Sequence, residues 1–140
     1  MESNPLHQQI ATMRQSFLDE EILNDQFIQL ESMATEDDPA FAEDTVNLYF
    51  QETTKIIATL EEEFVKDPID YNALEKCLHD FKGLCVSIGA SKVLIEVNKA
   101  RACCDNGNIE GGKAALEKVK VEQETLKAKL DSYFQLVKQS

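Results

Sequence analysis

The chain has 140 residues, of which 43% are hydrophobic and 29% are charged, and its formal net charge at pH 7 is −12. This length suits one domain with a real core, and the eight Gly and Pro residues favour long helices over strands joined by tight turns. Such an acidic surface repels nucleic acid phosphates and anionic lipids, so we expect neither nucleic acid nor membrane as a partner, although acidity also serves solubility alone.

The N-terminal third predicts two short helices. Apolar residues recur at helical spacing over Leu6–Asp19. A second helix follows, and its candidates for packing are Ile22, Phe27, Leu30 and Met33. Residues 35–39 then interrupt the pattern, with Asp38 placed to cap the next helix and Pro39 suited to its first position.

The remainder of the chain predicts four further helices, separated by local signals that stop a helix. The residue before Pro68 is pushed out of the helical region, Gly89 closes a helix, Ser91 is placed as a cap, and residues 105–107 (Asp-Asn-Gly) form a C-terminal stop. The expected helices are Ala40–Lys66, Ile69–Ser87, Lys92–Cys104 and Ile109–Lys138.

Four helices joined by short loops predict an all-α fold, an antiparallel up-and-down four-helix bundle. The two shorter N-terminal helices, within residues 1–36, are expected to extend or cover one end of the bundle formed by residues 39–138. The whole chain, residues 1–140, is then a single domain. Residues after 113 are rich in Lys and Glu, which is also typical of a coiled coil, but their irregular apolar spacing favours a bundle helix.

The cysteines and the N-terminus predict an intracellular protein without a metal site. Residues 1–10 lack a basic segment followed by an apolar stretch, and no apolar run reaches the roughly 18 residues that a membrane span needs. With two histidines and no CxxC pair, a zinc site is not expected. We expect reduced thiols at the four cysteines, namely Cys77, Cys85, Cys103 and Cys104.

The segment Leu74–Ala90 contains the residues that suggest chemistry. At about 100° per residue its apolar side chains form one stripe, made of Leu74, Leu78, Phe81, Cys85 and Ile88. His79 lies roughly 100–160° from most of that stripe, so we expect it to face solvent. The residues expected to share its face are Glu75, Lys76, Lys82, Gly83 and Val86.

Gly83 is unusual because glycine in a helix interior costs about 1 kcal/mol relative to alanine. One interpretation is a notch beside His79 that admits a phosphoryl group or a partner's loop, with the Lys82 ammonium next to the phosphate. Close helix packing at Gly83 is the alternative. Taken alone, an exposed His beside a Lys is ordinary surface; the combination of His79, Lys82 and Gly83 on one face favours function.

A neutral imidazole is a nucleophile near pH 7, because its unperturbed pKa is about 6.5. Attack of its outward ring nitrogen on an aspartyl phosphate gives phosphohistidine, which is itself a reactive phosphoryl donor. Two alternatives stay open: an acidic helical adaptor in which His79 is incidental, and a small hydrolase that uses His79 as a general base. No Gly-rich nucleotide loop and no evident Ser or Cys relay supports a complete enzyme.

The sequence resembles the plant histidine-containing phosphotransfer proteins of cytokinin two-component relays. The family pattern, His-x-x-Lys-Gly-Ser-Ser followed by Gly-Ala, appears here as residues 79–90, His-Asp-Phe-Lys-Gly-Leu-Cys-Val-Ser-Ile-Gly-Ala. Further matches are residues 38–41 (Asp-Pro-Ala-Phe) and residues 132–136 (Ser-Tyr-Phe-Gln-Leu), so the likeness spans essentially the whole chain.

The resemblance implies that His79 is phosphorylated, Lys82 is the cation beside the phosphate, and Gly83 gives clearance. It implies a carrier without turnover that accepts phosphoryl groups from receiver domains of hybrid sensor histidine kinases and delivers them to response regulators, in cytoplasm and nucleus. The chain would need no cofactor, Mg²⁺ being expected in the partner receiver domain. A monomer is expected, and the candidate docking residues are Lys76, Asp80, Val86 and Phe27.

Several positions depart from the family pattern. Leu84 and Cys85 replace the usual Ser-Ser, and Phe81 replaces a common Leu. Asp80 stands where Gln is frequent and adds a negative charge near the docking surface, which affects partner preference and transfer rate rather than the acceptor. Because His79 is present, the sequence does not support an inactive member that lacks the acceptor.

Overall fold

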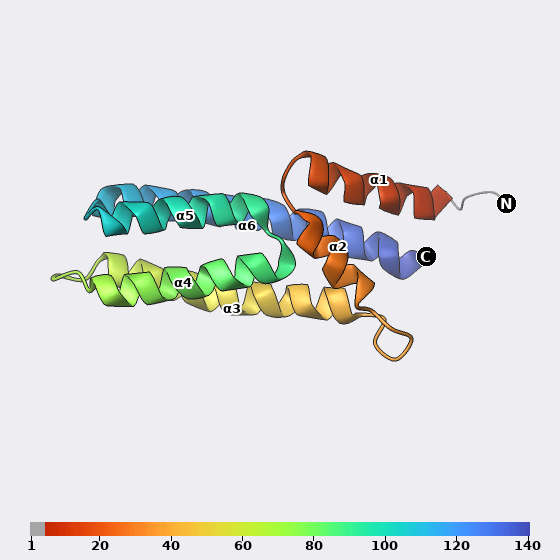
Figure 1. The fold of residues 1–140 in the computed structure, drawn as a ribbon, viewed down its shortest axis with the longest axis horizontal. Helices are drawn as coiled ribbons and strands as arrows, with labels where there is room; N and C mark the ends of the chain where they lie inside the picture. Colours follow the sequence, from red (N-terminus) through yellow and green to blue (C-terminus); the bar gives the residue numbers. More distant parts are fainter. Residues whose placement is uncertain (1–4) are drawn as a thin grey trace.

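The computed structural model describes residues 5–140 as an all-α protein. Its elements in chain order are α1 (Pro5–Asp19), α2 (Asp25–Ser32), α3 (Phe41–Phe64), α4 (Tyr71–Ile88), α5 (Ser91–Asp105) and α6 (Ile109–Gln139) (Figure 1). The predicted all-α fold is therefore confirmed.

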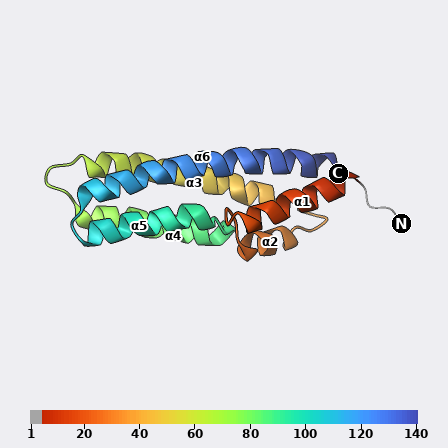
Figure 2. The ribbon, with the colours of Figure 1, turned by 90° about the horizontal axis from the view of Figure 1, so that it is seen from above.

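Helices α3 to α6 form the antiparallel bundle that the loop lengths predict, with α3 against α4 and α6, and α5 against α4 and α6. The α3 and α6 helices continue past the point where α4 turns into α5 (Figures 1 and 2). Beyond that turn α1 packs along α6, and α2 packs against α3 and α4. The two N-terminal helices thus extend one end of the bundle, as expected.

The core extends along the whole molecule and includes the full predicted stripe of α4. Leu74, Leu78, Phe81, Cys85 and Ile88 are each 0–1% exposed. At the end covered by α1 and α2 the core is aromatic, with edge-to-face contacts of Phe17 and Phe27 with Tyr133. Burial of this stripe fixes which side of α4 faces solvent.

Two expectations for the second helix are wrong. Phe27, a candidate docking residue, is 1% exposed, because α2 turns it inward against Tyr133 and Phe134. Met33, a candidate for packing, is 61% exposed because α2 ends at Ser32 and Met33 lies just outside the helix.

Two predicted caps are also wrong. The backbone of Asp38 closes a turn with Thr35, and α3 begins only at Phe41, so Pro39 lies outside the helix. Ser91 is the first residue of α5 rather than its cap, and its hydroxyl donates to the Gly89 carbonyl at 3.3 Å. Neither α3 nor α5 has a side-chain cap at its N-terminus.

The predicted helix stops agree better with the structure. Gly89 ends α4 in the left-handed conformation with φ +77°, and Gly107 follows the end of α5 with φ +72°.

Among residues 5–140 no helix is both long and apolar enough to cross a membrane. The four cysteines carry free thiols.

Candidate functional site

Helix α4 presents the candidate site, and a hydrogen bond holds each of its ends. At the N-terminus Asp70 Oδ1 accepts a hydrogen bond from the Ala73 amide at 3.1 Å. At the C-terminus the Gly89 carbonyl accepts one from the Asn24 amide at 3.0 Å, which ties the start of α2 to the end of α4. The site helix is therefore held at each end.

His79 is exposed on the side of α4 that faces away from the buried stripe. The sequence-predicted neighbours Lys76, Asp80, Lys82 and Gly83 are exposed as well, and Val86 is 51% exposed. The structure therefore confirms the expected orientation of His79 and brings these residues onto one helix, whereas Phe27 does not belong to this surface.

Gly83 has no packing role in this structure. A Cβ atom built at Gly83 meets no heavy atom within 4 Å, whereas one built at Gly112 lies 3.0 Å from the Phe64 ring. Close helix packing, the alternative explanation for Gly83, is therefore wrong. The surface one turn beyond His79 is bare backbone that stands open.

The lysines beside His79 are free to bind an anion. Nine of the fourteen Lys and Arg residues form ion pairs within the described chain. Lys76 and Lys82 have no such partner among residues 5–140, so no carboxylate there neutralises their ammonium groups.

Glu75, which the helical wheel places near His79, turns its carboxylate elsewhere. Glu75 Oε1 accepts a hydrogen bond from the Arg101 guanidinium of α5 at 2.7 Å. This ion pair joins α4 to α5 and engages the negative charge one turn before His79. Asp80 has no ion-pair partner within residues 5–140, so its charge remains available to influence an approaching partner.

Charge is divided unevenly over the molecule. Residues 71–105, which comprise α4 and α5, contain five Lys or Arg and four Asp or Glu, a net charge of +1. The rest of the chain therefore has a net charge of −13. Helix α6 is also close to neutral, with six Lys and five Asp or Glu, so the negative charge comes from residues 1–70, and the helix that presents His79 lies outside that segment.

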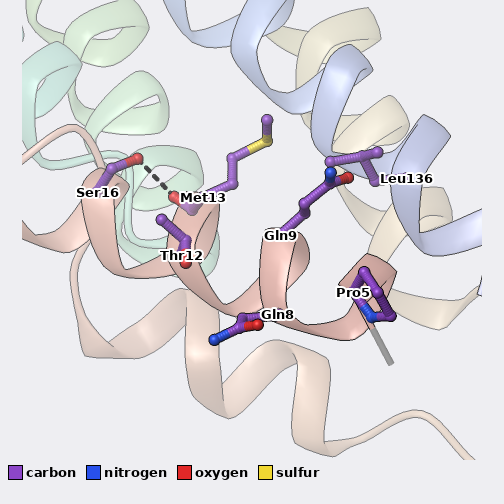
Figure 3. Close-up of a pocket in the computed structure, with 7 residues that line it drawn as sticks. All are labelled: Pro5, Gln8, Gln9, Thr12, Met13, Ser16 and Leu136. Atoms are coloured by element: carbon purple, nitrogen blue, oxygen red, sulfur yellow. Dashed lines mark hydrogen bonds between the residues drawn. The ribbon is translucent and has the colours of Figure 1, made fainter. Parts of the chain in front are cut away.

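Two other features of the described residues do not suggest a second catalytic site. No group of three or more His, Cys, Asp or Glu side chains there is arranged to hold a metal ion. A groove of about 630 Å³ is lined by Leu136 of α6 and six residues of α1, none of them charged (Figure 3). It offers neither an acid–base pair nor a nucleophile aligned with one.

Two parts of the surroundings of α4 were not expected from the sequence. Asn24 caps α2 through its side chain and also meets the end of α4 through its backbone. A buried hydrogen-bond network of Tyr49, Thr53 and Gln123 lies beneath α4. The Asn24–Asp25 start of α2 is a recognisable capping signal, but buried polar partners from distant helices leave no pattern in the sequence.

Curated relatives match nearly the full chain. Pseudo histidine-containing phosphotransfer protein 5 of rice (Oryza sativa subsp. japonica) is 37% identical, and the match covers 100% of this chain and 92% of the rice protein. Histidine-containing phosphotransfer protein 4 of Arabidopsis thaliana is 36% identical, with 90% of this chain and 95% of that protein covered. No protein-family model matches.

Solved structures show the same fold. The crystal structure of a histidine-containing phosphotransfer protein from maize has a TM-score of 0.85 and 28% identity, covering 96% of this chain and 98% of the maize chain. One from Medicago truncatula has a TM-score of 0.87 and 25% identity, covering 97% and 92%. The chain therefore belongs to the family of plant histidine-containing phosphotransfer proteins.

Proposed function

We propose that the chain accepts a phosphoryl group on His79 from a receiver-domain aspartate of a hybrid sensor histidine kinase. It then passes the group to response regulators in a cytokinin-type two-component relay. The observation that carries this proposal is the combination on α4 of an exposed imidazole, open backbone at Gly83 and the ammonium of Lys82, which has no ion-pair partner within residues 5–140.

The transfer needs little from this chain beyond a nucleophile and a cation. The lone pair of a neutral imidazole nitrogen attacks phosphorus, a P–N bond forms, and the P–O bond to the aspartate breaks to release its carboxylate. Lys82 offsets part of the negative charge of the phosphoryl oxygens. The reverse reaction uses the same groups, so one site serves both acceptance and delivery.

The partner supplies the remaining chemistry. A bound Mg²⁺ belongs to the receiver domain, and the present chain contributes no cofactor of its own. It acts as a monomeric carrier, a phosphorylated substrate of its partners without independent turnover, and it works in cytoplasm and nucleus. The nearly neutral α4–α5 part of the bundle supports approach of an anionic phosphoaspartate better than the acidic residues 1–70 do.

The direct experiment incubates the purified chain with a phosphorylated receiver domain and follows the label. Phosphohistidine is stable in alkali and labile in acid, so we expect label with that signature on the wild-type chain and none on His79→Gln. Equal labelling of the two proteins would refute the acceptor assignment. Repeated release of inorganic phosphate by the chain without a partner would favour the hydrolase alternative.

The names of some relatives favour a second candidate function. The rice relative described above carries the word "pseudo" in its name. An adaptor of the same fold would bind receiver domains through the α4 face without taking up the phosphoryl group. Receiver binding by both wild type and His79→Gln, with no label on either, is the result that distinguishes this adaptor from the carrier.

A further inference from the structure

Beneath the site, a network of buried hydrogen bonds links three helices of the bundle. Tyr49 and Thr53 lie on α3, Gln123 on α6, and Cys85 on the inner side of α4. Their side chains are 0–7% exposed. Three of the contacts join or lie within α3 and α6, and the contact between Tyr49 and Cys85 connects them to α4.

The direction of each bond follows from the partners. Gln123 Nε2 donates to Thr53 Oγ1 at 2.9 Å, and the Thr53 hydroxyl donates to the Tyr49 carbonyl at 2.8 Å. The amide oxygen of Gln123 therefore faces Tyr49 and accepts the phenol proton at 2.5 Å.

Because the proton of the Tyr49 hydroxyl is committed to Gln123, the 3.6 Å contact between that hydroxyl and Cys85 Sγ has the thiol as donor. Burial raises the pKa of Cys85 to about 12, which keeps this thiol protonated and able to donate. Cys85 is thus the residue through which α4 joins this hydrogen-bond network.

Hydrogen bonds weaken steeply with distance and angle, so the Cys85–Tyr49 contact adds a directional restraint on the rotation of α4 to the shape restraint of its close-packed apolar stripe. Side-chain atoms lie about 6 Å from a helix axis, so a rotation of 20° moves them by about 2 Å. Such a rotation would break the Cys85–Tyr49 contact and displace the imidazole of His79 by a similar distance. In-line transfer requires reacting atoms about 3–3.5 Å apart.

We propose that Tyr49, acting through Cys85 and held by Gln123, is a positioning residue that fixes the rotation of α4 and thereby aims His79 at the partner's phosphoryl group. This inference rests on the proposed function. It assigns Cys85, a departure from the family pattern, a role in the alignment of the reacting helix, in addition to its place in the core.

The test compares single-turnover transfer from a phosphorylated receiver domain over a range of receiver concentrations. We expect Tyr49→Phe and Cys85→Ala to lower the maximal rate on the order of tenfold, with the half-saturating receiver concentration unchanged. Cys85→Ser keeps a hydroxyl donor and should transfer like the wild type. Labelling by phosphoramidate, a small donor that needs no docking geometry, should be equal in all variants.

Tyr133→Phe is the matched control, because it removes a second buried phenol whose partners, Arg14 and Glu31, do not lie on α4. Its transfer rate should equal that of the wild type. Wild-type transfer by Tyr49→Phe, or equal slowing in Tyr133→Phe, would overturn the inference. If Tyr49→Phe fails to fold by circular dichroism, Cys85→Ala decides. Absence of transfer to the wild type itself would instead reject the proposed function.

Discussion

At the scale of single residues, the exposure of His79 and the charge around it depend on its neighbours. The apolar stripe of α4 is fully buried, and this turns the imidazole outward. Arg101 engages the Glu75 carboxylate, whereas Lys76 and Lys82 have no ion-pair partner within residues 5–140. The result is an accessible nucleophile with unneutralised cations on the same helix.

Lys82→Ala should slow phosphoryl transfer on the order of tenfold, because an ammonium that offsets the phosphoryl charge is lost. The fold should be unaffected, since Lys82 is exposed and makes no ion pair in the described structure. Lys118→Ala is the control, because Lys118 lies on α6, is exposed and has no ion-pair partner within residues 5–140, and it should leave the rate unchanged. Rapid-quench transfer assays measure both, and an equal rate for Lys82→Ala and wild type would remove Lys82 from the site.

Gly83→Ala should raise the free energy of unfolding by up to about 1 kcal/mol, because helix propensity improves and a Cβ there meets no atom within 4 Å. Gly83→Leu should also fold well but should abolish docking of a receiver domain, since its side chain fills the notch beside His79. Urea unfolding and receiver binding measured on both variants test this. Undiminished receiver binding by Gly83→Leu would show that the open backbone has no role in docking.

At the scale of elements, the end of α4 shows how a glycine couples two helices. Gly89 has a left-handed φ, and a Cβ there would lie 2.4 Å from Asn24 Oδ1 and 3.0 Å from the Phe27 amide nitrogen. The Gly-Ala pair that follows the site helix therefore allows α2 to approach closely enough for its Asn24 amide to bond to α4.

Gly89→Ala should lower the free energy of unfolding by more than Gly107→Ala does. Both substitutions place a side chain at positive φ, which costs about 1–2 kcal/mol, but only Gly89 has neighbours within 4 Å. Chemical denaturation of the two variants gives the comparison, and the difference between them measures the steric cost of a Cβ where α2 approaches α4. Equal losses would mean that this junction accommodates the added methyl group and is not closely packed.

The helices and the orientation of His79 were predictable because both follow from apolar periodicity within one segment. The errors came from places where local chemistry has several solutions. Asp38 satisfies its backbone in a turn with Thr35 instead of capping α3, and the eight-residue α2 is too short for its pattern to separate the buried Phe27 from the exposed Met33. The Tyr49–Gln123 bond joins residues 74 apart, a pairing that only the fold creates.

At the scale of the whole molecule, buried acids predict a loss of stability in alkali. Burial raises the pKa of Cys104 to about 11 and that of Cys85 to about 12, from an ordinary value of 9.0, and it also raises the pKa values of Tyr49 and Tyr133. Above pH 9 the unfolded chain releases protons that the folded chain retains, so unfolding becomes easier as pH rises.

The free energy of unfolding should therefore fall from about pH 9 toward pH 11–12, by up to about 1.4 kcal/mol per pH unit for each thiol. Urea titrations at a series of pH values measure the decline. Cys85→Ser removes one of the thiols and should give a shallower slope over this range. A stability that stays constant between pH 8 and pH 11 would contradict the burial of these groups.

The central claim is that His79 on α4 receives the phosphoryl group, and site mapping after transfer tests it most directly. The chain is incubated with a phosphorylated receiver domain, digested at alkaline pH and examined by mass spectrometry for the modified peptide. We expect up to one phosphoryl group per chain, located on His79, and an unmodified peptide from His79→Gln. A phosphoryl group on any other residue, or none on the wild type while the receiver remains phosphorylated and bound, would contradict the account.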